Sequence, residues 1–159
     1  TIACIPRQTY LCEHVSLDWR ERLPSDMSVA AVDAELLDEE RLECPPHLDR
    51  WMRSNWITRE TFLAQGFGVV TRCGKRVVSW SLCDCAWEDR CEIGIHSDPA
   101  WRRRGLGAIT AAAATEHALG RGYSRVGWHC NSENIGSVKT AERVGYVHKL
   151  SYSMYFVCG

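Results

Sequence analysis

The sequence lacks a long apolar stretch, a leader pattern and any repeat. No run approaches the ~18 consecutive apolar residues that a membrane-spanning helix needs. The first residues do not show the basic and then apolar pattern of a secretory leader. We therefore expect a cytoplasmic protein without a membrane partner. Because the chain begins at Thr1 rather than Met, we also expect it to be processed, trimmed or a piece of a longer protein.

An excess of charge of one sign is missing too. The 19 Lys and Arg residues nearly balance the 20 Asp and Glu residues, which leaves a net charge of −1. Such a chain has no overall attraction to nucleic acid or to an anionic membrane, so we expect neither partner. A length of 159 residues suits one domain, and 45% apolar and 25% charged residues are typical of a globular protein.

Cysteine is abundant, but the spacing that would give it a metal-binding role is absent. The nine cysteines form no Cys-x-x-Cys pair, and an odd number cannot all pair internally. A zinc site would need paired short spacings. We expect free thiols that are buried as small apolar groups in a reducing compartment, and no metal.

A strand, a basic glycine loop and a helix follow one another over residues 91–120. The strand pattern over 91–97 is broken by Asp98-Pro99, then Arg-Arg-Arg-Gly-Leu-Gly fills 102–107 and an alanine-rich helix begins. Glycine allows close approach of a ligand to the backbone. The free N–H groups and dipole of a helix start favour an anion, and arginines add donors. This arrangement predicts a phosphate site.

The spacing of the loop separates the possible phosphate ligands. No Lys-Ser or Lys-Thr follows a glycine pair, as a P-loop requires, and Thr110 stands where the dinucleotide fingerprint needs its third glycine. What remains is Arg-x-x-Gly-x-Gly. Taken alone, it can also be a solvated basic turn before a helix.

A second motif decides between these interpretations. Residues 134–146 read Asn-Ile-Gly-Ser-Val-Lys-Thr-Ala-Glu-Arg-Val-Gly-Tyr, one helix and one strand after the loop. The two motifs, in this order, resemble the GNAT superfamily of acyl-CoA N-acyltransferases over about residues 66–158. Trp56 with 66–68, Glu-Ile-Gly-Ile over 92–95 and Trp-His-Cys-Asn over 128–131 resemble a branch of small bacterial GNAT acetyltransferases.

The resemblance implies an α/β (α+β) fold. We expect a mixed central sheet of about six to seven strands, splayed at two central parallel strands and flanked by helices. We expect residues 1–159 to be one acetyltransferase domain, in which 1–65 form helices on the acceptor side and 66–159 form the sheet and the cofactor-binding core. Residue patterns predict strands over 9–17, 67–73, 76–84, 91–97, 124–130, 146–150 and 151–157, and helices over 28–42, 47–55, 58–66, 106–121 and 134–144.

The resemblance also implies acetyl-CoA as co-substrate, bound where the parallel strands splay. The pantetheine arm would pair with the backbone of Ile95 and Ser97, and the pyrophosphate would lie on the amides of 103–108. Asn131 and Asn134 match positions that contact the arm or order the loop, although Asn134 is equally well a helix cap. The expected cofactor-binding residues are Ile95, His96, Ser97, Arg102, Arg103, Arg104, Gly105, Leu106, Gly107, Ala108, Asn131, Asn134 and Ser137.

Acetyl transfer to an amine needs a proton acceptor, since an alkyl ammonium has a pKa of ~10.4. Glu92 on the central strand is our candidate base, with His96 and His129 as alternatives. Many family members protonate the leaving thiolate with a tyrosine, but Ala141 occupies that position. The thiolate then leaves unaided or takes its proton from Tyr152, Tyr155, Cys130 or water.

The function implied by the resemblance is an N-acetyltransferase that moves the acetyl group directly to a primary amine in a ternary complex. The alternative is a non-catalytic acyl-CoA-binding module of the same fold, which Ala141 favours. A nucleic-acid-binding domain would need a wider basic surface. Trp51, Trp56 and Phe62 either contact the acceptor or pack on the sheet. The identity of the amine is not encoded in any motif, and monomer and homodimer both stay open.

Overall fold

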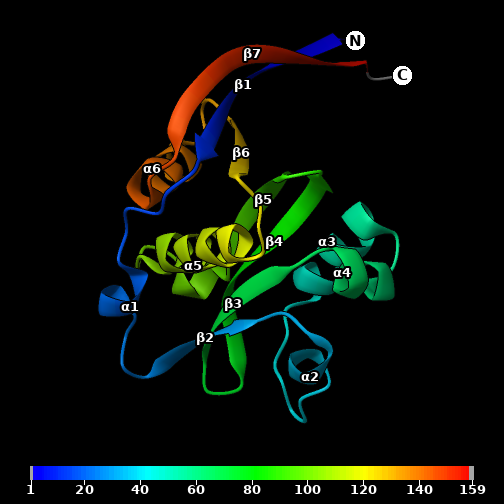
Figure 1. Ribbon diagram of the computed structural model, residues 1–159, viewed down its shortest axis with the longest axis vertical. Coiled ribbons are helices and arrows are strands. Elements are labelled where there is room, and N and C mark those ends of the chain that lie inside the picture. Colours follow the sequence, from blue (N-terminus) through cyan, green and yellow to red (C-terminus); the bar gives the residue numbers. More distant parts are fainter. Residues whose placement is uncertain (1, 158–159) are drawn as a thin grey trace.

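A seven-stranded mixed sheet forms the centre of the molecule. The computed structural model describes residues 2–157. The strand order is β2-β3-β4-β5-β6-β1-β7, and helices cover both faces (Figure 1). No helix among the described residues is long and apolar enough to cross a membrane.

One half of the sheet is an antiparallel meander. β2 (Met27–Ala31), β3 (Gly68–Cys73), β4 (Arg76–Trp87) and β5 (Arg90–Ser97) pair in turn. Gly74 turns the chain from β3 to β4 with a φ of +56°, a conformation that glycine adopts without strain. The other half contains β6 (Arg125–Asn131), β1 (Ile2–Cys12) and β7 (Val147–Val157), again antiparallel. β1 and β7 extend together as a long arm (Figure 1).

The two halves meet at the only parallel strand pair among residues 2–157. β5 and β6 are in register at Arg90–Arg125, Cys91–Val126 and Glu92–Gly127, and their pairing stops there. Beyond that point the strands diverge. The expected splay at two central parallel strands is therefore confirmed.

One face of the sheet is covered by α5 (Leu106–Gly120), with α1 (Trp19–Arg22) and α6 (Ile135–Val144) beside it. Alanines over 111–114 are at most 5% exposed, so the helix lies close to the strands. The spacing of the apolar residues in this helix predicts one buried face. The helix is buried on more of its circumference because α1 and α6 pack on the sides that the sheet does not reach.

The opposite face carries α3 (Pro46–Trp56), α4 (Arg59–Gln65) and α2 (Ala34–Leu37). Leu48, Met52 and Phe62 of these helices pack against Trp80 and Leu82 of β4. The predicted helices at 47–55 and 58–66 are confirmed, and Thr58 caps the second one through a hydrogen bond from the Thr61 amide, with an N to Oγ1 distance of 3.0 Å.

Three expectations about the chain were wrong in detail. Residues 28–42 are not one helix: 27–31 form edge strand β2 and Asp33 caps the short α2. The strand expected at 9–17 covers 2–12, so residues 1–65 supply two strands as well as helices. The last two strands are one continuous β7, because an extra residue, Lys149, is accommodated opposite Thr9 and Tyr10 while β1 pairs along its length.

Candidate active site

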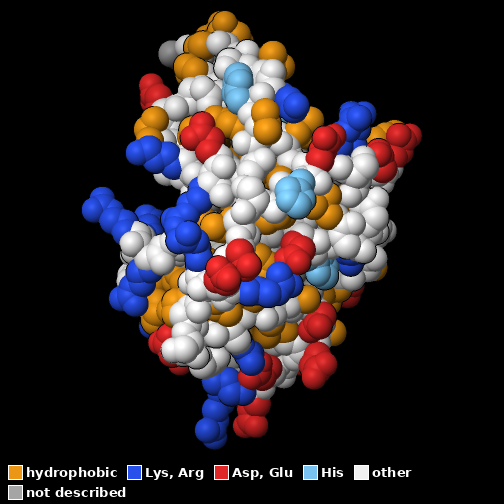
Figure 2. Space-filling model, turned by 60° about the vertical axis from the view of Figure 1, so that its left-hand side comes forward, with side chains coloured by type: hydrophobic (Ala, Val, Ile, Leu, Met, Phe, Trp, Pro, Cys, Tyr) orange, Lys and Arg blue, Asp and Glu red, His pale blue; other side chains and the backbone are white. Residues whose placement is uncertain are grey.

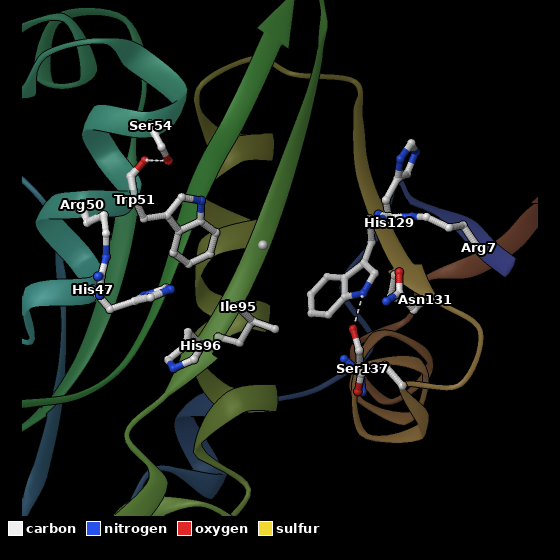
Figure 3. Close-up of a pocket in the computed structure, with 14 residues that line it drawn as sticks. Arg7, His47, Arg50, Trp51, Ser54, Ile95, His96, His129, Asn131 and Ser137 are labelled. Atoms are coloured by element: carbon white, nitrogen blue, oxygen red, sulfur yellow. Dashed lines mark hydrogen bonds between the residues drawn. The ribbon is translucent and has the colours of Figure 1, made fainter. Parts of the chain in front are cut away.

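A cavity opens where β5 and β6 separate. It measures about 580 Å³, and its walls come from β5, β6, α3, the start of α6 and Arg7 of β1. Figure 3 shows His47, Arg50 and Trp51 on one side of this cavity, with His129 and Asn131 on the other. The cavity exists because β5 and β6 do not pair with each other beyond Glu92 and Gly127.

A second cavity of about 650 Å³ lies over the basic glycine loop. Ile95, His96, Asn134 and Ser137 are in the walls of both cavities, so the two adjoin along β5 and the start of α6. Together they form one groove, which we call the splay groove. It runs from the N-terminus of α5 to the point where β5 and β6 part.

The loop is shaped by two residues with left-handed backbone. Gly105 is the N-cap of α5 with a φ of 76°, and Arg103 has a φ of 60°. As at any helix start, the first amides of α5 have no partner within the helix, and the residues that carry them line the groove. The loop residues that line the groove are Arg102, Arg103, Gly105, Leu106, Gly107 and Ala108.

The three arginines of the loop differ in their surroundings. The Nε of Arg102 donates to the backbone oxygen of Ser97 over 3.3 Å. The guanidinium of Arg104 lies over the ring of Trp101, 4.7 Å from its centre, and is not in the wall of the groove. The structure thus separates Arg104 from the other expected cofactor-binding residues.

Two further cations were not predicted from the sequence. Lys139 and Arg143 of α6 line the groove opposite the loop, and an Nη of Arg143 is 3.9 Å from the position that a Cβ of residue 105 would take. Residues four apart share one helix face, which is the signal that could have found them. Figure 2 shows Lys and Arg side chains gathered at the left-hand edge of the molecule. This charge is local, because the net charge is only −1.

The expected asparagines and Ser137 stand at the turn from β6 to α6. Asn131 lines the groove, and the Asn134 side chain caps α6 by accepting from the Ser137 amide over 3.1 Å. The hydroxyl of Ser137 accepts from the Nε1 of Trp128 over 3.0 Å. Ser137 and the buried Trp128 therefore fix the start of α6 against β6.

The candidate bases are distributed over two groups. Glu92 and His129 lie side by side, with 3.0 Å between Oε1 and Nε2, and each side chain is about one third exposed. His96 instead stacks on His47 with 4.2 Å between ring centres. The Nε1 of Trp80 donates to Nδ1 of His47 over 3.2 Å. Burial lowers the pKa of both His47 and His96.

The possible proton donors to a thiolate are few among the described residues. Ala141, at the position of the family's tyrosine, is fully buried. Tyr146 is buried too, shares a hydrogen bond of 2.8 Å with Thr115, and has its pKa raised by burial. Cys130 lines the groove, and the ring of Tyr152 lies 6.2 Å from that of His129.

The aromatic residues expected near the acceptor divide between groove and core. Trp51 lines the groove, whereas Phe62 is fully buried in the core. The Nε1 of Trp56 donates to the backbone oxygen of Cys83 over 2.8 Å. Trp51 also donates to Asp84, a carboxylate that no sequence pattern singled out.

Cysteines and metal ligands are dispersed over the part of the chain that the structure covers. The eight cysteines within residues 2–157 are all free thiols. No three His, Cys, Asp or Glu side chains in that range are placed to hold a metal ion together.

A model of GNAT acetyltransferases matches residues 6–155, nearly the whole chain. The chain belongs to the GNAT acetyltransferase family. No curated protein matches it. Its fold is shared with a GCN5-related N-acetyltransferase-like protein from Streptococcus suis, at 24% identity and a TM-score of 0.74 over 97% of this chain and 61% of that one.

Other solved structures of the GNAT fold are more distant in sequence. A GCN5-related N-acetyltransferase from Kribbella flavida has 18% identity and a TM-score of 0.67, over 97% of this chain and 58% of that chain. A soil metagenomic aminoglycoside acetyltransferase, solved with sisomicin, has 12% identity and a TM-score of 0.54, over 76% and 88%. The chain thus spans about three fifths of the length of the first two GNAT proteins.

Proposed function

We propose that this GNAT protein transfers an acetyl group from acetyl-CoA to a primary amine, by direct attack of the amine in a ternary complex. The observation that carries the proposal is the splay groove, which runs from the start of α5 to His129, whose Nε2 lies 3.0 Å from Oε1 of Glu92. We further propose that residues 1–159 form one domain, with α3 on the acceptor side of the groove.

The cofactor's phosphates fit the end of the groove at α5. In this proposal the pyrophosphate accepts hydrogen bonds from the amides of 103–108, while Arg103, Lys139 and Arg143 supply charge. Helix N-termini favour anions through their free N–H groups and dipole. Gly107 faces Ile95 and Ser97, and a Cβ there would lie only 3.7 Å from the Ser97 hydroxyl. This is an ordinary contact distance, so residue 107 borders the passage between loop and strand, and a side chain longer than a methyl group would enter it.

The pantetheine arm fits the diverging strands. Backbone groups of β5 beyond Glu92 have lost their partners on β6, and buried backbone groups need hydrogen bonds. The amides of pantetheine would pair with the backbone of Ile95 and Ser97 on one side, next to the side chains of Asn131 and Asn134 on the other. This places the thioester toward Glu92 and His129.

The chemistry follows from that placement. The amine nitrogen attacks the thioester carbonyl, the C–N bond forms and the C–S bond breaks. Glu92 and His129 form the pair that accepts the proton which the attacking nitrogen loses. With Ala141 in place of a tyrosine, the thiolate takes its proton from Cys130, Tyr152, His129 or water. An unaided departure is feasible, because a thiol pKa near ~8.5 makes thiolate a tolerable leaving group.

A second candidate function is an acyl-CoA-binding module without turnover. Ala141 is the observation that favours it, since the position of the family's proton donor is filled by a buried methyl group. The two functions differ in one measurable quantity, the release of free CoA thiol in the presence of an amine.

The experiment that tests the proposed cofactor site is calorimetric titration with acetyl-CoA. Gly107→Glu places a carboxylate in the passage between loop and strand without needing an unusual backbone. Gly120→Glu is the matched control on the same helix, where a Cβ meets no atom within 4 Å. We expect micromolar binding by the wild type and Gly120→Glu, and none by folded Gly107→Glu. Equal binding by all three, or no binding by the wild type, contradicts the proposal.

A further inference from the structure

Asp84 lies at an irregularity of β4 beside the splay groove. Cys83 is paired with Ile93 and Cys85 with Glu92, so Asp84 has no residue opposite it on β5. One extra residue of this kind makes a β-bulge, and a bulge re-aims a side chain. Here it turns the Asp84 carboxyl to the face of the sheet that α3 covers.

The two oxygens of this carboxyl have different surroundings. Oδ1 accepts from the Nε1 of Trp51 and from the Nδ2 of Asn55, both over 2.6 Å. Oδ2 accepts no hydrogen bond from any residue in the described range. It lies 3.2 Å from the position that a Cβ of residue 94 would take, and Gly94 is in the wall of the groove. One oxygen is thus held in place, while the other is unpaired and lies next to Gly94, a wall residue of the groove.

The surroundings of Asp84 raise the pKa of its carboxyl group toward neutral pH. Burial raises the pKa of Asp84 to about 6, the negative charge of Glu92 acts in the same direction, and the hydrogen bonds from Trp51 and Asn55 act in the opposite direction. The titratable neighbours are Glu92 on β5 and the Cys83 and Cys85 thiols on β4. The donors from α3 to Asp84 are the neutral Trp51 and Asn55, while Arg50 of α3 and Arg7 of β1 lie in the wall of the groove. A base whose pKa lies near the working pH is the most effective.

We propose that Asp84 takes the first proton from the ammonium form of the acceptor. The inference rests on the proposed function. The indole of Trp51 lies against Gly94 beside the free Oδ2, and an ammonium group is attracted both to a carboxylate and to an indole face. Oε1 of Glu92 is paired with Nε2 of His129, whereas Asp84 has no salt-bridge partner among the described residues.

The protons of the reaction balance with two accepting groups. The ammonium R–NH₃⁺ gives one proton to Asp84 and becomes R–NH₂. Its lone pair then forms the C–N bond with the thioester carbon, and the C–S bond breaks. The second proton leaves the nitrogen through Glu92 and His129 and ends on the thiolate sulfur. Asp84 returns its proton to solvent, so the products are the amide, CoA thiol and H⁺.

The test compares Asp84→Asn with the wild type in pH profiles of kcat/KM, with acetyl-CoA and a panel of 1,4-diaminobutane, benzylamine and the aminoglycoside sisomicin. The amide oxygen of the substituted side chain can still accept from Trp51 and Asn55, so the fold should be kept. We expect kcat/KM for the amine to fall about 100-fold. The fall of kcat/KM on the acidic side of the pH profile, near pH 6, should disappear. Acetyl-CoA binding and the unfolding midpoint should stay unchanged. Asp49→Asn on the exposed side of α3 is the matched control and should behave as wild type.

Two outcomes overturn the inference, and they are distinguishable. In the first, Asp84→Asn keeps the acidic limb of the wild-type pH profile and a kcat/KM within about twofold of the wild-type value. Asp84 then takes no proton, although the enzyme transfers acetyl groups. If the wild type binds acetyl-CoA but releases no thiol with any amine of the panel, the proposed function fails, and the role of Asp84 fails with it.

Discussion

Gly94 is the residue on which the geometry of Trp51 and Asp84 depends, and Gly94→Ala tests it. A Cβ at this position would lie 2.5 Å from Cζ2 and 2.8 Å from Cη2 of Trp51. Carbon atoms in contact are about 3.5–4.0 Å apart, so the indole has to move by about 1 Å. That movement stretches the bond of 2.6 Å from Trp51 to Asp84 beyond hydrogen-bonding distance.

The expected cost follows from the bond that is lost. Hydrogen bonds to charged groups contribute about 1.5–3 kcal/mol. Since Asn55 still donates to the same oxygen, we expect the free energy of unfolding to fall by about 1.5 kcal/mol, at the low end of that range. The bond from Trp51 lowers the pKa of Asp84. Its loss should therefore move the acidic limb of the activity profile to higher pH.

Two assays measure these effects, urea unfolding and the pH dependence of thiol release. Gly120→Ala is the control, because a Cβ there meets no atom within 4 Å, and alanine in an exposed helix should add about 0.5–1 kcal/mol. The reasoning is refuted if Gly94→Ala unfolds at the wild-type urea concentration and its acidic limb does not move.

Three further predictions concern buried or partly buried groups. Tyr146→Phe removes the hydrogen bond to Thr115 and should lower the free energy of unfolding by about 1 kcal/mol, without changing thiol release; a loss of activity in the folded variant would contradict this. Burial lowers the pKa of His47, so the unfolded chain binds its proton more readily and stability should fall as the pH drops below the ordinary histidine value of about 6.5. His47→Gln, which keeps an acceptor for Trp80, should weaken that fall in acid titrations followed by circular dichroism, and an unchanged fall would refute it. Ala141→Tyr overpacks a fully buried position and should lower the free energy of unfolding by about 3 kcal/mol in urea unfolding. A variant as stable as the wild type that releases thiol faster would contradict this expectation.

The end of the groove at which we propose anion binding could be predicted from the sequence because it is built from neighbours in the chain. A strand, the loop at 102–107 and α5 follow one another, so spacing alone places glycines and helix amides together. Lys139 and Arg143 belong to the same site but come from a different helix. Their shared helix face was readable, but its direction toward the loop was set by the packing of α6 beside α5.

The sequence by itself determined most strands and helices and the two motifs, because periodicity, capping residues and glycine spacing are local properties. The fold class followed from the resemblance of those motifs to the GNAT superfamily. Only the tertiary structure paired Glu92 with His129 and brought Asp84 to Trp51 and Gly94. These residues lie on different strands and helices. Their contacts depend on strand register, on the bulge at Asp84 and on the angle at which α3 crosses the sheet, and no short stretch of sequence fixes any of those.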